Sequence, residues 1–304
     1  MEAVAIPRSG ARALVALGSC CLLALTACGS VTASSHGKVR LVAGENFWGN
    51  VAAQIGGDRA TVTSIISDPG ADPHEYESTV DDAAAVAQAN IVLENGLGYD
   101  DFLTKLTSAA PNANRTMLNV GDLVGDHGTN PNPHLWYHPA DVITAAHAIK
   151  NALAKAAPAD ASTFQANLAT FLSGEQKVVG VVHQIKTKYA GTAVAYTERV
   201  PGYLVAAAGL KLATPESFSL SLEDGNDPSP RDNAAFENAL SQHTARVLIY
   251  NAQVSDSATK HLRDLATSAG VPVVSMTETL PSTEANFQTW QAHQASDLLA
   301  ALGG

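Results

Sequence analysis

Cysteine is nearly absent from this sequence of 304 residues, and its three cysteines, Cys20, Cys21 and Cys28, all lie close to the N-terminus. The rest of the chain has no thiol pair, which excludes a disulfide framework and a cysteine-based metal site there. Any metal ligands in that part of the chain must therefore be histidine or carboxylate side chains.

Positive charge is also scarce: the sequence has 18 Lys and Arg but 29 Asp and Glu, which gives a formal net charge of −11. A surface this acidic repels phosphate backbones, so we expect no nucleic-acid partner. The sequence contains no long block of like charge and no low-complexity tract. With 46% apolar and 15% charged residues, the composition is that of a folded globular protein.

Long hydrophobic runs are missing apart from residues 13–25, which follow Arg8 and Arg12. This run is too short to cross a bilayer as a stable helix, and it is typical of a signal peptide. It ends in Leu-Thr-Ala before Cys28, which resembles the bacterial lipobox, where the cysteine is lipidated. We expect a lipoprotein signal peptide over residues 1–27 and a lipid anchor on Cys28; the alternative is an ordinary signal peptide with a chance cysteine.

The segment 28–37 consists mainly of small and polar residues, a composition typical of a flexible tether. A protein with such an anchor and tether lies on the extracytoplasmic face of the bacterial cell membrane. The folded part is expected to begin near Lys38.

Short apolar runs alternate with helical patterns from there on, as in βαβ units with parallel sheets. Ser229 and Pro230 suit the N-cap and first position of one helix, and a last helix is predicted from about Thr283. The predicted strands cover residues 39–43, 61–66, 90–94, 116–120, 193–197, 212–215, 246–251 and 271–276.

One helical pattern is much longer than the others. Apolar residues recur mostly three or four apart from Phe164 to Ile185, which predicts a helix roughly 40 Å long that joins two lobes. The expected fold class is α/β, with a mostly parallel sheet flanked by helices in each lobe. The lobes are assigned to residues 38–160 and 190–304, and the connecting helix to residues 161–189.

Two histidines stand directly behind prolines in separate loops. His74 follows Pro73 in a polar loop that leaves the carboxyl end of a predicted strand, where open α/β sheets place ligands. His134 follows Pro133 and precedes aromatic residues able to shield it from water. Proline stiffens the backbone, so each imidazole is presented in a defined position. Taken alone, a loop histidine is more often simply solvated.

Two carboxylates occupy comparable places in the second half. Glu198 comes directly after one predicted strand, and Glu278 lies two residues beyond another. Each could instead be a surface residue, or a side chain that helps to start a helix. Together His74, His134, Glu198 and Glu278 supply two imidazoles and two carboxylates, two from each lobe, which predicts a metal site in the cleft between lobes.

Several motifs resemble the metal-binding lipoproteins of zinc and manganese ABC importers, known as cluster A-I solute-binding proteins. The resemblance runs from about Lys38 to the C-terminus. It is carried by Phe47-Trp48-Gly49, Asp72-Pro73-His74-Glu75-Tyr76-Glu77, Asn132-Pro133-His134-Leu135-Trp136 and Thr277-Glu278-Thr279-Leu280.

The resemblance implies two α/β lobes joined by a rigid backbone helix, with one Zn²⁺ or Mn²⁺ ion bound as cargo between them. His74 and His134 match the two histidine ligands of the first lobe. Glu198 falls where zinc carriers usually have histidine and manganese carriers often have glutamate. Glu278 stands where the family usually has aspartate, whose side chain is one methylene shorter. His138 falls where relatives often have aspartate or serine before proline, so it either supports the metal ligands or caps a helix, and the cap is the favoured role.

The function that follows is capture of the ion and delivery to an ABC permease by a monomeric, membrane-anchored binding protein. A metal-dependent hydrolase and a surface adhesin are the alternatives. The sequence has no His-Glu-x-x-His helix, no nucleophile elbow, no P-loop and no dinucleotide fingerprint, so we expect that the protein is not an enzyme.

Overall fold

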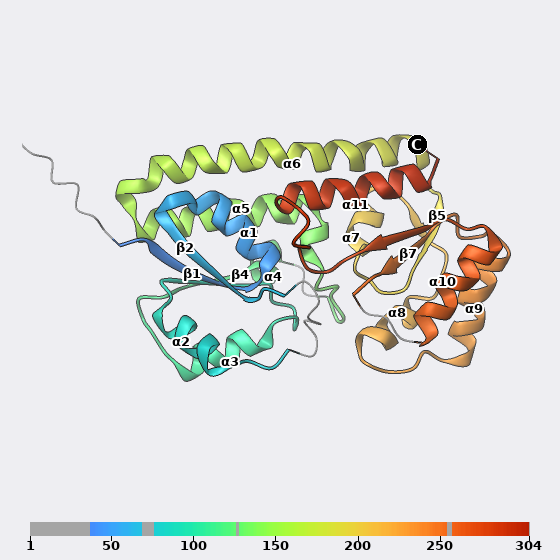
Figure 1. Ribbon diagram of the computed structural model, residues 1–304, viewed down its shortest axis with the longest axis horizontal. Helices are drawn as coiled ribbons and strands as arrows, with labels where there is room; N and C mark the ends of the chain where they lie inside the picture. Colours follow the sequence, from blue (N-terminus) through green and yellow to red (C-terminus); the bar gives the residue numbers. More distant parts are fainter. Residues whose placement is uncertain (1–36, 69–75, 126–127, 254–256, 304) are drawn as a thin grey trace, which may run out of the picture. The chain divides into compact units, whose positions relative to one another are not determined.

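Eight short strands form two separate sheets in a computed structural model that describes residues 37–68, 76–125, 128–253 and 257–303 (Figure 1). The predicted signal peptide, Cys28 and His74 lie outside these residues. The described strands are β1 (Val39–Glu45), β2 (Ala60–Ile66), β3 (Ile91–Glu94), β4 (Thr116–Asn119), β5 (Ala193–Tyr196), β6 (Lys211–Leu212), β7 (Leu248–Asn251) and β8 (Val273–Met276).

Both sheets are parallel throughout. The first has the strand order β2-β1-β3-β4, and the second has the order β6-β5-β7-β8. Leu41 of β1 is in register with Val62 of β2 and with Ile91 of β3. All residues of β3 and of β7 are buried, as expected for parallel strands covered on both faces. The predicted α/β fold class is confirmed.

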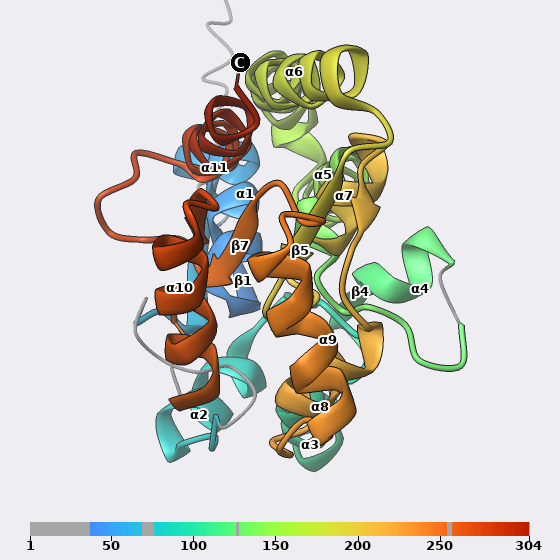
Figure 2. The same cartoon turned by 90° about the vertical axis from the view of Figure 1, so that its right-hand side faces the viewer.

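Helices cover the faces of both sheets. They are α1 (Asn46–Gly56), α2 (Val80–Gln88), α3 (Asp101–Ala109), α4 (Val120–Val124), α5 (Pro139–Ala156), α6 (Ala161–Tyr189), α7 (Gly202–Ala207), α8 (Glu216–Glu223), α9 (Pro230–Ser241), α10 (Ser257–Ala269) and α11 (Phe287–Ala301). Figure 2 shows α9 and α10, which pack against each other. Among the described residues, no helix has the length and apolar character needed to cross a membrane.

Helix α6 is the predicted long helix, and its 29 residues pack against α1 and α5 as well as α7 and α11. It therefore contacts helices that flank both sheets (Figure 1). Its predicted apolar positions are all buried, namely Phe164, Leu168, Phe171, Val178, Val182 and Ile185. Residues 37–304 accordingly form one compact unit.

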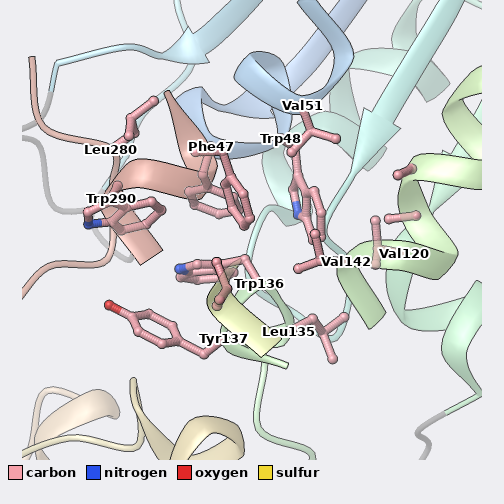
Figure 3. Close-up of a cluster of buried hydrophobic side chains, with 14 of the residues drawn as sticks. Phe47, Trp48, Val51, Val120, Leu135, Trp136, Tyr137, Val142, Leu280 and Trp290 are labelled. Carbon is pink, nitrogen blue, oxygen red and sulfur yellow. The ribbon is translucent and has the colours of Figure 1, made fainter. Parts of the chain in front are cut away.

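Aromatic side chains from distant segments meet in the core between these helices. Phe47 of α1 stacks on Trp136, with ring centroids 4.0 Å apart, and Tyr137 meets Trp290 of α11 edge to face (Figure 3). Trp136 and Tyr137 belong to a short 3₁₀ helix, Leu135–Tyr137, directly after His134. The core therefore fixes the backbone that carries this histidine.

One acidic side chain lies inside the long helix. Glu175 of α6 is only 1% exposed, and burial raises the pKa of its carboxyl to about 7. The carboxyl is therefore protonated in the folded protein over a pH range in which it is ionised in the unfolded chain.

Changing Glu175 to glutamine is therefore expected to make folding stability less dependent on pH. Because the folded pKa is raised, the unfolded chain binds fewer protons between about pH 4.5 and 7, and the wild type loses stability as pH rises through this window. The loss of folding stability over this window is at most about 3.5 kcal/mol, at about 1.4 kcal/mol per pH unit. Urea unfolding of both proteins from pH 4 to 8 measures the free energy of unfolding at each pH. If this free energy changes with pH equally in the wild type and in Glu175→Gln, Glu175 is ionised in the folded protein.

Candidate functional site

His134 is fully buried, and its ring is oriented by its own loop. Asn132 Oδ1 accepts a hydrogen bond from the His134 backbone N–H at 3.1 Å and lies 2.6 Å from Nδ1. An Nδ1–H that donates to this oxygen leaves Nε2 as the acceptor nitrogen. Nε2 lies 3.5 Å from Glu278 Oε2, so the histidine faces a carboxylate from the other half of the chain.

Glu278 lies in the loop after β8 and is also fully buried. Gln253 Oε1 accepts hydrogen bonds from the backbone N–H groups of Glu278 and Thr279. Asn46, the first residue of α1, accepts from the N–H of Leu280 at 2.8 Å and donates to its carbonyl oxygen at 2.9 Å. The loop that carries Glu278 is therefore bonded to both halves of the chain.

Glu198 follows β5 and is 2% exposed. The next residue, Arg199, forms a nearly buried ion pair with Glu223, with Nη2 and Oε2 2.7 Å apart. Arg199 Nη1 donates to the carbonyl oxygen of Asn130, and Asn132 Nδ2 donates to that of Arg199. The loops that present His134 and Glu198 are thus bonded directly to each other.

One amide links the two carboxylates. Asn251, the last residue of β7, donates from Nδ2 to Glu198 Oε2 at 2.8 Å and to Glu278 Oε1 at 2.7 Å. Tyr99 OH donates to Glu278 Oε2 at 2.9 Å. The structure thus brings three of the four predicted residues, His134, Glu198 and Glu278, into one buried polar cluster.

A buried acid holds the loop that carries Tyr99. Asp100 accepts from the backbone N–H groups of Asn95 at 2.7 Å and Gly96 at 2.8 Å, while Asn95 Nδ2 donates to the carbonyl oxygen of Pro133 at 2.8 Å. Burial raises the pKa of Asp100 to about 7 and that of the neighbouring Glu45 well above its ordinary value. This network ties the Tyr99 loop to the residue before His134.

His74 lies outside the described residues, so its position relative to this cluster is a prediction. Within the part of the chain that the structure describes, no group of three or more His, Cys, Asp and Glu side chains is arranged to hold a metal ion. The described side chains alone therefore do not form a complete metal-binding set, although His134 and Glu278 already face each other.

His138 is not part of the cluster. It occupies the N-cap position of α5, but its side chain makes no capping hydrogen bond to the helix backbone. Its Nδ1 lies 2.9 Å from Asp141 Oδ2 instead, and this hydrogen bond raises the pKa of the imidazole. The prediction of a helix cap is correct in position and wrong in the contact that the side chain makes.

Asn251, Tyr99 and Gln253 contact the polar cluster but were not among the residues predicted from the sequence. Asn251 ends a parallel strand, and the rule that pointed to Glu198 would have found it, since both residues stand at the carboxyl edge of the second sheet. Tyr99 and Gln253 lie in loops where neither spacing nor residue type marks them.

Solved structures with this fold include the Cd-bound periplasmic metal-binding protein of Candidatus Liberibacter asiaticus and the periplasmic zinc-binding protein TroA of Treponema pallidum. The TM-score is 0.74 for both, with 18% and 17% identity. The matches cover 87% and 88% of this chain, and 100% and 99% of those chains. At this identity, the likeness establishes the fold.

Curated relatives include the manganese-binding lipoprotein MntA of Halalkalibacterium halodurans, 26% identical over 147 residues, which are 48% of this chain and 49% of that protein. The iron-binding protein YfeA of Yersinia pestis is 31% identical over 125 residues, 39% of each protein. The chain spans about half the length of such relatives or less.

A family model described as zinc-uptake complex component A, periplasmic, matches residues 41–301 and so covers both sheets, apart from the first two residues of β1, and the helices from α1 to α11. The motifs that suggested a metal-binding solute carrier, around His74, His134, Glu198 and Glu278, all lie within these residues. The chain belongs to the zinc-uptake complex component A family.

Proposed function

We propose that this protein captures one divalent transition-metal ion, Zn²⁺ or Mn²⁺, and delivers it to the permease of an ABC importer. The observation that carries the proposal is the contact between two buried side chains, in which His134 Nε2 lies 3.5 Å from Glu278 Oε2. Glu198 joins the same cluster through the hydrogen bonds that Asn251 donates to both glutamates. His74, His134, Glu198 and Glu278 are the proposed ligands.

The chemistry of this set suits a dipositive transition metal. Imidazole nitrogen and carboxylate oxygen are ligands that both Zn²⁺ and Mn²⁺ accept, and two carboxylates balance the charge of the ion in a buried site. Relatives named for manganese, iron and zinc binding support the same class of ion.

Burial of the cluster favours carriage of the ion over catalysis. His134 and Glu278 have no exposed surface, and Glu198 is 2% exposed. A metal-dependent hydrolase needs a coordination position open to water and substrate. We therefore propose that the protein is not an enzyme; rapid hydrolysis of esters or peptides by the metal-loaded protein would contradict this.

The predicted lipobox supports attachment through Cys28 to the extracytoplasmic face of the bacterial cell membrane, and we propose that the protein works there as a monomer. A relative such as ScbA of Streptococcus cristatus is named as a metal ABC transporter substrate-binding lipoprotein. This name supports both the anchor and the transporter partner.

Elemental analysis of protein purified without chelators, followed by calorimetric titration of the metal-free protein with Zn²⁺ and Mn²⁺, tests the function. The expected result is one transition-metal ion per chain, with a raised melting temperature because the ion binds only the folded state. Failure of both ions to bind would overturn the proposal.

A further inference from the structure

Basic side chains gather at the edge of the first sheet where its strands begin. Lys38 and Arg40 stand on either side of Val39, the first residue of β1, which starts at the left of Figure 1. Arg115 directly precedes β4, and Lys155 lies in the last turn of α5. Arg115 and Lys155 line one pocket of about 370 Å³. We call these four residues, Lys38, Arg40, Arg115 and Lys155, the basic edge.

Backbone contacts hold two members of the basic edge at the ends of helices. Arg40 Nε donates at 2.7 Å to the carbonyl oxygen of Gln88, the last residue of α2. Arg115 Nη2 donates at 2.9 Å to the carbonyl oxygen of Ala110, the C-cap of α3. A cation is favourable at a helix C-terminus, where carbonyl groups lack partners. These bonds fix the two guanidinium groups without removing their charge.

No carboxylate in the described part of the chain forms an ion pair with the basic edge. Asp58 and Asp160 lie near the start of β2, and both pair with Arg59, at 3.3 and 3.5 Å. Lys38 and Lys155 are exposed. The basic edge is therefore a patch of positive charge on a chain whose net charge is −11.

The opposite edge of the same sheet is acidic. Glu45 and Glu94 are the last residues of β1 and β3, and Asp101 begins α3. The charge of the first sheet therefore changes sign along its strands. A negatively charged surface attracts the edge where the strands begin and repels the edge where they end.

We propose that the basic edge rests on the anionic headgroups of the membrane to which Cys28 is anchored. The inference rests on the membrane attachment proposed above. Val39 lies 11 positions after Cys28, a length of chain that spans at most about 40 Å when fully extended. A lipid on Cys28 thus keeps the basic edge within reach of the bilayer. Each Lys or Arg next to an anionic membrane contributes about fivefold in affinity.

Hydrogen exchange on vesicles tests this contact. The chain from Cys28 onward has no other thiol, so it can be coupled through Cys28 to a maleimide lipid, whether or not the cell lipidates it. We expect the amides of residues 110–116 to exchange at least about fivefold more slowly on phosphatidylglycerol vesicles than on phosphatidylcholine vesicles. The difference should disappear in about 1 M salt, where the Debye length falls to about 3 Å. Residues 224–227, exposed in the second half of the chain, should exchange alike on both lipids.

Charge reversals identify the residues responsible. Lys38→Glu and Lys155→Glu should each remove most of the protection on phosphatidylglycerol. Lys260→Glu is the matched control, because it makes the same change in net charge at an exposed position of α10. It should leave the protection in place. Equal exchange on the two lipids in the wild type, or equal loss in all three variants, would overturn the inference. Failure to bind Zn²⁺ and Mn²⁺ would instead refute metal capture, and would leave the lipid contact unaffected.

Discussion

Replacing His134 with alanine is expected to lower the affinity for Zn²⁺ or Mn²⁺ by more than about 100-fold, since loss of a group that only supports a ligand already costs about 10- to 100-fold. His134 is fully buried, its Nδ1 side is held by Asn132, and its Nε2 faces Glu278. No neighbouring histidine in the described residues can replace it, because His138 pairs with Asp141. Calorimetric titration of the metal-free variant measures the loss.

His138→Ala is the control for this prediction. His138 lies in the same loop, four residues away, but its side chain is 35% exposed and paired with Asp141. Its loss should leave metal affinity close to that of the wild type. Equal losses in the two variants would show that the loop as a whole, and not the His134 ring, determines binding.

The fold was predictable because its signals are local. Strands such as β3 and β7 are continuous apolar runs, and the apolar spacing from Phe164 to Ile185 identifies α6 with little ambiguity. Ser229 caps α9 as predicted, since its side chain accepts from the N–H of Asp232. Each of these features depends on residues close together in sequence.

The exact ends of helices and strands were less predictable, because they depend on the contacts of individual side chains. The last helix, expected from about Thr283, begins at Phe287, because Asn286 and Thr289 form a reciprocal cap that ends the preceding loop. The predicted strand 212–215 shrinks to Lys211–Leu212, and Pro215, which is still extended, occupies the N-cap position of α8.

The residues of the candidate site could likewise be predicted where their signals are local, but the contacts between them could not. His134 and Glu278 could be singled out from proline framing and from strand ends, because both signals are local. Their contact joins residues far apart in sequence, and so does the bridge through Asn251, which only the packing of the two halves creates. The sequence therefore indicates the donors of the site, while the residues that orient them appear only in the structure.

The ion pair of Arg199 and Glu223, next to Glu198, is one such orienting contact, and it contributes to folding stability. Glu223, the last residue of α8, contacts Arg199 Nη2 and Nε at 2.7 Å and accepts from the Arg199 backbone N–H at 2.5 Å. Both side chains are nearly buried, with 9% and 5% exposed. Removal of one partner leaves a buried charge without its counterion, which typically costs about 3 to 5 kcal/mol.

Glu223→Ala is therefore expected to lower the free energy of unfolding by about 3 to 5 kcal/mol, measured by urea unfolding of the metal-free protein. Asp264→Ala breaks the exposed pair with Arg263, whose side chains are 44% and 74% exposed, and should cost no more than about 1 kcal/mol. Because Arg199 follows Glu198 directly, Glu223→Ala should also weaken metal binding, although no proposed ligand is changed. A stable variant with unchanged affinity would show that the Glu198 loop is held by its bonds to Asn130 and Asn132 alone.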